Sequence, residues 1–263
     1  YGRDEKVMVE FVSANPTGPM HMGNARGGAL GDCLAAVLDK AGYNAWREFY
    51  VNDAGNQIEK FGCSLEARYL QIFKGDEIEF PEDGYQGEDI KDLAKEYADL
   101  NGDSLVNVSA EERKKALVDF ALPKNISKMQ ADMEKYKIFY DKWFFESELH
   151  KSGAVKAVVD LLTKKGLTYE KEGAVWYKNK EVLTQKLLKE GKSQKYIDNL
   201  ELKDDVLIRQ NGNPTYFTAD IAYHKNKFDR GFTTLIDVWG ADHHGHVMRM
   251  KGAMDAIGYD GDK

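Results

Sequence analysis

The sequence has 263 residues, of which 42% are hydrophobic and 31% are charged, and its formal net charge is −7. This composition predicts a folded globular protein without membrane-spanning segments, and the acidic balance argues against a large nucleic-acid-binding surface on this chain. The two cysteines, Cys33 and Cys63, lack a metal-binding spacing, which predicts free buried thiols in a reducing compartment. Because no signal peptide is visible after Tyr1, we expect a cytoplasmic protein that has no membrane partner.

The first part of the chain, residues 1–62, predicts a β-turn-α-β-α order. Residues 7–12 are apolar and β-branched, as expected of a buried parallel strand, and a Pro/Gly turn then leads into a helix over 22–41. Residues 44–51 predict a second strand, and another helix opens at Gln57. A β-α-β unit of this length implies a parallel pair with a right-handed crossover.

The middle part, residues 63–205, is charged and mainly helical. Its helix candidates are 62–74, 88–101, 109–135, 147–165 and 181–191, with a small β element at 173–177. Residues 206–263 return to α/β character, with a strand at 206–209, a turn at 211–214, a helix at 217–229, a strand at 234–239 and a helix at 243–257.

This order of elements predicts an α/β, Rossmann-like nucleotide-binding fold with a parallel sheet. Residues 1–62 and 206–263 would form its two halves, and the mainly helical insertion would split them. In such a fold the ligand lies at the carboxyl ends of the strands. We therefore expect residues 10–15, 51–53 and 239–242 to converge.

The turn between the first strand and the first helix carries the clearest functional signal. It reads Ser-Ala-Asn-Pro-Thr-Gly-Pro-Met-His-Met-Gly-Asn over residues 13–24. Unpaired backbone N–H groups at the start of a helix attract phosphate, and His21 adds a side-chain donor. A glycine-rich turn of this kind can instead serve tight packing alone.

A second polar cluster, Trp-Gly-Ala-Asp-His-His-Gly-His, occupies residues 239–246. The spacing argues against a zinc site, because His243 and His244 point about 100° apart on a helix. We expect instead a nucleotide pocket, in which Gly240 lets the backbone approach the ligand and Asp242 accepts from ribose hydroxyls. A histidine can instead only cap or solvate the helix, and we expect this of His244.

A third pattern, Tyr-Phe-Thr-Ala-Asp, places Tyr216 and Asp220 one turn apart on one face of a helix. An aromatic ring beside a carboxylate can hold a guanidinium by stacking and a forked ion pair. An acid near the start of a helix is explained equally well by the helix dipole. Glu10 lies within an apolar strand, and a charge in such a place needs a partner.

Together these motifs resemble class I aminoacyl-tRNA synthetases, and specifically arginyl-tRNA synthetases. Residues 13–24 are similar to that family's version of the His-Ile-Gly-His signature, with Asn24 in place of the second histidine. Asparagine can donate a hydrogen bond but cannot carry a proton charge. Residues 239–243 are similar to the family's Trp-Gly-Ala-Asp-His segment, and residues 216–220 are similar to its arginine-pocket helix.

The resemblance implies a role for each candidate residue. It implies that His21 and Asn24 are catalytic, and that ATP is bound by Pro16, Thr17, Gly18, Pro19, His21, Gly23, Asn24, Gly240, Asp242 and His246. It implies that arginine is bound by Glu10, Ser13, Asn15, Glu146, Tyr216, Asp220 and His243, although Glu146 can also be read as a helix-start acid. Mg²⁺ would accompany ATP through phosphate oxygens, without dedicated protein ligands.

The implied reaction joins L-arginine to tRNA(Arg) through arginyl-adenylate, with ATP consumed. The sequence contains no Lys-Met-Ser-Lys signature, so we expect a truncated, monomeric catalytic fragment that is inactive alone and contacts tRNA mostly through other domains. Two alternatives remain. One is another nucleotidyl transferase of the same fold, and the other is a noncatalytic synthetase-like binding module.

Overall fold

The computed structural model describes residues 1–263, except for the side chains of Asp76, Asp242 and His244. The chain divides into two compact units. The first contains Tyr1–Phe11, Cys33–Glu48 and Glu146–Lys263, and the second contains Val12–Asp32 and Phe49–Phe145. Residues 146–205, which we expected inside the insertion, thus share a unit with residues 206–263. The division of the chain into two catalytic halves and an insertion stays a prediction.

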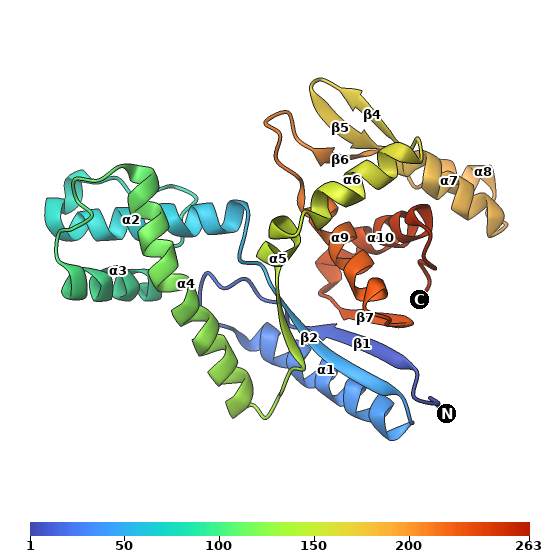
Figure 1. The fold of residues 1–263 in the computed structure, drawn as a ribbon, viewed down its shortest axis with the longest axis horizontal. Coiled ribbons are helices and arrows are strands. Elements are labelled where there is room, and N and C mark those ends of the chain that lie inside the picture. Colours follow the sequence, from blue (N-terminus) through green and yellow to red (C-terminus); the bar gives the residue numbers. More distant parts are fainter. The chain divides into compact units, whose positions relative to one another are not determined.

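The main sheet has the strand order β3-β2-β1-β7 (Figure 1). β1 (Lys6–Phe11) pairs in parallel with β2 (Asn44–Val51) and with β7 (Thr234–Val238). All residues of β1 after Lys6 are buried, which explains its nearly continuous apolar run. α1 (Met22–Lys40) connects β1 to β2. The predicted α/β fold with a parallel sheet is confirmed, whereas the four-residue β3 (Lys142–Phe145) was not predicted.

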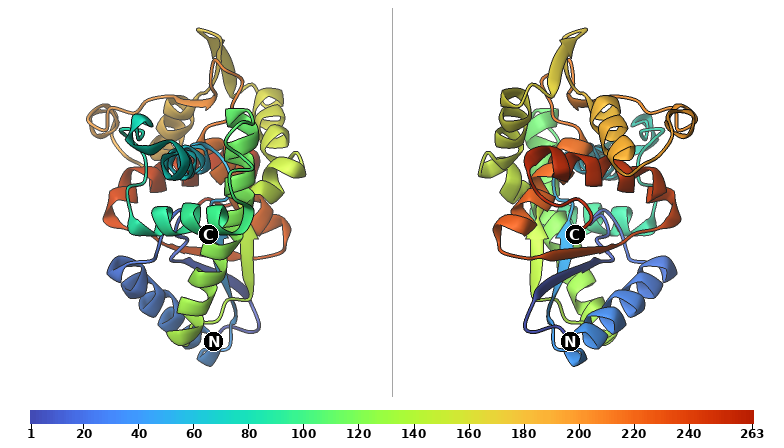
Figure 2. Two further views of the ribbon diagram at one scale, coloured as in Figure 1. Left: turned by 90° about the vertical axis from the view of Figure 1, so that its left-hand side faces the viewer. Right: turned by 90° about the vertical axis from the view of Figure 1, so that its right-hand side faces the viewer.

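The helices of the first unit pack around α9 (Tyr216–Asp229). This helix contacts α5 (Glu146–Lys151), α6 (Ala154–Lys164) and α10 (His244–Ile257), and α10 contacts α7 (Asn179–Lys189). Figure 2 shows α9 and α10, in orange and red, side by side above β7. The helix predicted over 147–165 is two helices, because Gly153 adopts a φ of 75° between them.

A small antiparallel sheet belongs to the same unit. It consists of β4 (Thr168–Lys171), β5 (Ala174–Tyr177) and β6 (Asp205–Ile208), and the short helix α8 (Gln194–Asp198) follows α7. The predicted β element at 173–177 is therefore the central strand of this sheet.

In the second unit, α2 (Asn56–Lys74), α3 (Glu88–Asn101) and α4 (Ala110–Lys135) pack against one another, and Gly75–Glu77 forms a 3-10 turn. Their shared core contains Phe61, Leu65, Tyr69, Ile90, Leu93 and Leu117. Apolar residues spaced three and four apart on each helix supply this core. The predicted helices at 62–74, 88–101 and 109–135 are confirmed.

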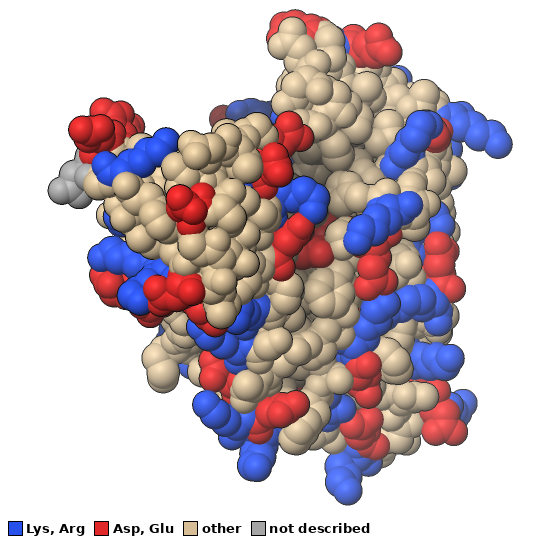
Figure 3. Space-filling model, turned by 60° about the vertical axis from the view of Figure 1, so that its left-hand side comes forward, with Lys and Arg blue, Asp and Glu red and all other residues tan. Residues whose placement is uncertain are grey.

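The surface carries charges of both signs. Lysine and arginine side chains are interspersed with acidic ones on the face shown in Figure 3. Several pair along a helix, as Lys91 does with Glu88 and Lys95 with Asp99. Exposed pairs of this kind contribute only about 0–1 kcal/mol each. Within the described part of the chain, no helix combines the length and the apolar character needed to cross a membrane.

Candidate functional site

The turn that follows β1 is held in a strained conformation. Val12 and Ser13 have φ angles of 71° and 43°, which are rare outside glycine and costly for a β-branched residue such as valine. Ser13 Oγ accepts a 3.1 Å hydrogen bond from the backbone N–H of Tyr50, and Asn125 Nδ2 donates a 3.0 Å hydrogen bond to the carbonyl of Pro16. Strained backbone held by its surroundings is common at functional sites. The predicted contact of Ser13 with arginine stays a prediction.

Two reciprocal hydrogen bonds close the first turn of α1. The backbone N–H of Gly23 donates to His21 Nδ1 at 3.1 Å, and the backbone N–H of His21 donates to Asn24 Oδ1 at 2.9 Å. The arrangement is that of a capping box. A Cβ at position 23 would lie 2.9 Å from His21 Cε1, so a larger residue there would displace the ring from this hydrogen bond. Since Nδ1 accepts, a neutral His21 ring carries its proton on Nε2.

These caps correct one expectation about the start of the helix. We expected unpaired backbone N–H groups there to attract phosphate, but those of His21 and Gly23 already donate to side chains. The exposed His21 ring still offers Nε2–H, and the half-buried Asn24 still offers its Nδ2 amide. The side-chain donors of His21 and Asn24 therefore stay candidates for phosphate binding, which remains a prediction.

The other predicted ATP-binding residues of this turn differ in accessibility. Pro16 and Thr17 are buried, Gly18 is half-buried and Pro19 is exposed, as is Asn15, which was predicted to bind arginine. Gly18 and Pro19 line a cavity of about 230 Å³. Ligand contact at the buried positions would need the backbone rather than the side chains. The binding of ATP by these residues stays a prediction.

In the first unit, one face of α9 carries polar side chains from the surface into the core. Tyr216 is 41% exposed, His224 is 6% exposed and Lys227 is fully buried. Asp220 lies between the first two and is half-buried. Steps of three and four residues place all four on the same face of the helix. The predicted pair Tyr216 and Asp220 therefore lies at the accessible end.

Asp220 is contacted by side chains of α10. His246 Nε2 lies 3.0 Å from Asp220 Oδ2, and Arg249 Nη2 donates to His246 Nδ1 at 2.8 Å. Arg249 also pairs with Asp205 on β6. The structure thus places His246, predicted to bind ATP, against the carboxylate predicted to bind arginine.

Glu10 has the buried partner that a charge in an apolar strand requires. Its Oε2 lies 2.5 Å from Lys227 Nζ, which also lies 2.7 Å from Asp237 Oδ1. His224 Nε2 lies 2.9 Å from Asp237 Oδ2, and His224 Nδ1 lies 2.8 Å from the carbonyl of Asp220. Two carboxylates therefore face the Lys227 ammonium and the His224 ring.

The charges of this cluster keep one another ionised. Burial raises the pKa of Asp237, but Lys227 and His224 outweigh it and hold that pKa well below its ordinary value. Burial lowers the pKa of Lys227, but Asp237 and Glu10 outweigh it and hold that pKa above its ordinary value. The cluster is therefore a fixed link between β1, β7 and α9.

A second buried cluster fixes α9 to β2. Glu48 is fully buried and accepts hydrogen bonds from both terminal nitrogens of Arg230, at 3.0 and 2.5 Å. It also accepts from the Tyr223 hydroxyl at 2.8 Å and from Trp46 Nε1 at 3.0 Å. Burial, followed by the nearby carboxylates of Glu10 and Glu48, raises the pKa of Tyr223 well above its usual range. Tyr223 therefore acts as a donor that orients the helix.

The remaining predicted residues of the first unit lie on α5 and near the start of α10. Glu146 is 4% exposed, and its Oε1 lies 3.2 Å from His150 Nε2. Gly240 and His243 are exposed, and the backbone N–H of His243 donates to the Gly240 carbonyl at 3.1 Å. The predicted ribose contact, the Asp242 side chain, lies outside the described residues, as does that of His244.

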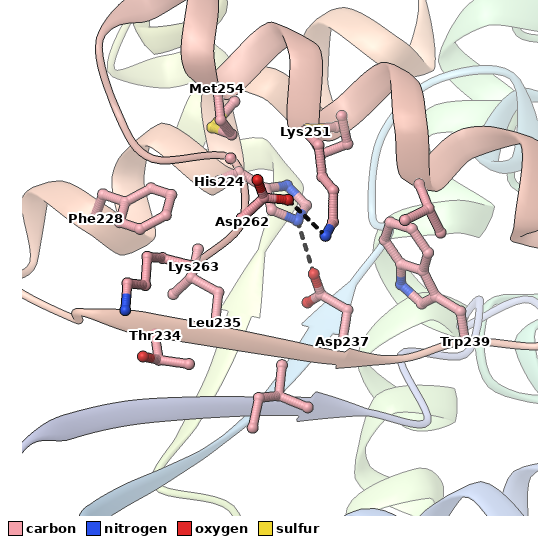
Figure 4. A pocket seen from close by; sticks show the side chains of 14 residues that line it. His224, Phe228, Thr234, Leu235, Asp237, Trp239, Lys251, Met254, Asp262 and Lys263 are labelled. Carbon is pink, nitrogen blue, oxygen red and sulfur yellow. Dashed lines mark hydrogen bonds and ion pairs between the residues drawn. The ribbon is translucent and has the colours of Figure 1, made fainter. Parts of the chain in front are cut away.

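A cavity of about 350 Å³ lies in the first unit (Figure 4). Its lining combines apolar side chains with a hydrogen bond between His224 and Asp237 and an ion pair between Lys251 and Asp262. None of the described residues that line it belongs to the predicted ATP or arginine sets. This cavity therefore does not coincide with the predicted site.

The described side chains form no candidate metal site. Among the residues that the structure describes, no group of three or more His, Cys, Asp or Glu side chains could hold a metal ion. Both cysteines are free thiols, but Cys33 is exposed and Cys63 is half-buried, so the expectation that they are buried was wrong.

The predicted site residues fall into two groups. Residues 13–24 belong to the second unit, and the first unit contains Glu10, Glu146, Tyr216, Asp220 and residues 240–246. Their convergence at the strand ends stays a prediction.

The sequence analysis did not predict which side chains these residues contact. Like Glu10, Asp237 is a charged residue within an apolar strand. The same reasoning would have predicted a partner for it. In the sequence, the charged residues Lys227 and Arg249 are typical of the solvent-facing side of an amphipathic helix. Only the packing of the helices shows that they have buried or half-buried partners. Their roles therefore emerge only from the fold.

Comparison with known proteins identifies the family. The model of the family "tRNA synthetases class I (R), catalytic domain" matches residues 1–263. The arginine–tRNA ligase of Ruminiclostridium cellulolyticum is 59% identical over 100% of this chain and 44% of its own length, and that of Caldanaerobacter subterraneus is 60% identical over 98% and 43%. The chain thus spans less than half the length of these curated relatives.

Solved structures show the same fold. A Campylobacter jejuni protein, provisionally described as an arginyl-tRNA synthetase, matches with a TM-score of 0.82 and 38% identity over 99% of this chain and 53% of its own. Thermus thermophilus arginyl-tRNA synthetase matches with a TM-score of 0.67 and 21% identity over 99% and 47% of the two chains, which supports the fold alone. The chain belongs to the catalytic-domain family of the class I (R) tRNA synthetases.

Proposed function

We propose that this protein is an arginine–tRNA ligase, which activates L-arginine with ATP and transfers it to tRNA(Arg). The observation that carries the proposal is the match of the family model to residues 1–263. The accessible Tyr216 and Asp220 on α9 support arginine as the amino acid. A permanently charged, planar guanidinium is well suited to a carboxylate beside an aromatic ring.

Arginine would be held at both of its ends. Asp220 and Tyr216 would bind the guanidinium, with Glu146 as a second carboxylate. Glu10, Ser13 and Asn15 would bind the charged amino and carboxylate groups, and His243 would complete the set. The burial of Glu146 supports its role, because a fixed, desolvated carboxylate binds a cation more strongly than a mobile one.

ATP would be bound by the turn before α1 and by residues near the start of α10. His21 Nε2–H and the Asn24 Nδ2 amide would donate to phosphate oxygens, while residues 16–19 and Gly23 shape the turn. Gly240 and Asp242 would hold the ribose, and His246 was predicted to join them. Mg²⁺, where bound, would neutralise charge on the phosphates.

The proposed chemistry has two steps and no covalent protein intermediate. A carboxylate oxygen of arginine attacks the α-phosphorus of ATP, and the bond to the leaving pyrophosphate breaks. A terminal hydroxyl of tRNA then attacks the arginyl carbonyl, and AMP leaves. Donors placed where negative charge grows stabilise such transition states, which is the role proposed for His21.

The partners of the protein follow from the same proposal. We place the reaction in the cytoplasm and expect a monomer. Contacts with tRNA(Arg) would lie mostly outside this chain, whose net charge of −7 disfavours binding of a nucleic-acid backbone over a large surface.

Arginine-dependent ATP–pyrophosphate exchange by the complete gene product, with and without tRNA(Arg), tests the proposal. We expect exchange with arginine and none with lysine or with citrulline, the neutral analogue. Exchange that ignores arginine would point to another nucleotidyl transferase. Binding of arginine or RNA without exchange in either arm would point to a noncatalytic module.

A further inference from the structure

We propose that His246 and Arg249 are positioning residues that orient the Asp220 carboxylate for a guanidinium side chain. The inference rests on the proposed function, because it concerns the carboxylate proposed to bind arginine. It differs from the role predicted for His246 in ATP binding. The argument depends on which atoms of the two side chains face each other.

Arg249 decides which nitrogen of His246 carries the proton. A guanidinium has only donors, and Arg249 Nη2 lies 2.8 Å from His246 Nδ1. His246 Nδ1 must therefore accept and carry no proton. The proton of the ring lies on Nε2, which is 3.0 Å from Asp220 Oδ2. The ring is thereby set as a donor toward the carboxylate.

The donor is buried and not yet aligned with its acceptor. Among the described residues, His246 Nε2 forms no hydrogen bond of good geometry, although Asp220 lies within ion-pair distance. A buried donor left in this way calls for an explanation. A guanidinium bound in a fork fixes the plane of its carboxylate. We propose that His246 Nε2–H donates to a lone pair of an Asp220 oxygen that the forked guanidinium does not use.

The packing around His246 keeps the ring in place. Phe217 meets it edge to face, with 5.8 Å between ring centroids and 81° between planes, and the Trp239 ring lies 5.3 Å away. Arg249 is held in turn, because its guanidinium lies 4.9 Å from the Phe217 ring centroid and pairs with Asp205. The chain Asp205–Arg249–His246 thus ends at Asp220 with a defined donor.

The first test determines the tautomer of His246 in the wild-type protein. Two-bond ¹H–¹⁵N correlation spectra of the complete protein, labelled with ¹⁵N-histidine, report the tautomer of each neutral ring. We expect His246 to be the Nε2–H tautomer. The Nδ1–H tautomer or a doubly protonated ring would overturn the proposal. The resonance is assigned by its loss in His246→Gln.

The second test separates arginine binding from ATP binding. His246→Phe keeps a ring between Phe217 and Trp239 but removes the donor, so we expect the arginine KM to rise about 10- to 100-fold with the ATP KM little changed. His246→Gln places an amide nitrogen near the former Nε2 and should restore most of the arginine affinity. Lys251→Met, a change on the same helix in an exposed pair, is the control.

The outcomes distinguish this inference from the proposed function. Wild-type protein that does not activate arginine contradicts the function. Active wild type with His246→Phe indistinguishable from Lys251→Met in its arginine KM contradicts only the positioning role. A rise confined to the ATP KM, or equal losses in the Phe and Gln variants, also overturns it. Melting temperatures confirm that each variant is folded.

Discussion

Asn24 Oδ1 accepts a 2.9 Å hydrogen bond from the backbone N–H of His21. Asn24, which stands in place of the second signature histidine, therefore also caps the start of α1. The bond occupies the oxygen of the amide and leaves the role of donor to Nδ2. Stability and the proposed ligand binding at position 24 therefore involve different atoms of one side chain, which makes them separable by mutation.

Asn24→Asp should preserve stability and impair ATP binding. The carboxylate keeps the acceptor for His21 and is favoured near the start of a helix, but it has no donor and repels phosphate. We expect an unchanged or higher melting temperature and an ATP KM raised at least roughly 10-fold. Asn24→Ala, as the comparison, should lose about 1 kcal/mol in urea unfolding. An Asp variant with the wild-type ATP KM would exclude Nδ2 as a ligand.

His21→Asn and His21→Gln should divide the two functions of the histidine. Asparagine keeps an acceptor near Nδ1 for Gly23 but loses the distal donor, so pyrophosphate-exchange turnover should fall about 10²- to 10³-fold with little change in the ATP KM. Glutamine keeps the distal donor and weakens the cap. We expect it to melt at a lower temperature yet turn over faster than the Asn variant. The reverse order of turnover would refute the role of Nε2.

Asp220→Asn should raise the arginine KM strongly, because a neutral amide leaves the guanidinium half paired. Loss of one partner of a buried charge pair typically costs about 3–5 kcal/mol, and the half-exposed position of Asp220 places the effect at the lower end. ATP binding should be nearly unchanged. Asp229→Asn, at the other end of the same helix and largely exposed, serves as the control. An arginine KM equal to that of the control would contradict the proposed binding of the guanidinium by Asp220.

Lys227→Met should destabilise the protein by about 3–5 kcal/mol in equilibrium urea unfolding, since it leaves Glu10 and Asp237 as buried, uncompensated carboxylates. Lys225→Met is the matched control. That lysine lies two positions earlier on α9 and pairs with Asp229 near the surface, where the cost is about 0–1 kcal/mol. Equal losses for the two variants would show that the buried cluster contributes little.

The stabilising effect of Asp237 should depend on pH in the acid range. Its pKa in the folded protein lies below the ordinary value of the unfolded chain, so the carboxylate stabilises the fold above that ordinary value. The difference in unfolding free energy between wild type and Asp237→Asn should be largest above about pH 5 and shrink as the pH falls below about 4. A difference that stays constant from neutral to acid pH would contradict the shift.

The regular elements were largely predictable because they follow from local periodicity. The long helices α1, α3 and α9 and the strands β1 and β2 appear close to where the apolar pattern places them. β3 was missed, since a strand of four aromatic and charged residues is too short to show alternation.

Sequence by itself determined the fold class, the family resemblance and the identity of single candidates such as His21, Asp220 and Glu10. These depend on residue type and on neighbours within one turn or one strand. Only the tertiary structure decided what those side chains contact. Glu10 meets Lys227 across 217 residues, and Asp220 meets His246 from another helix. Such pairs have no periodic signal, because they form only when packing has brought separate elements together and removed the water that would otherwise solvate each charge.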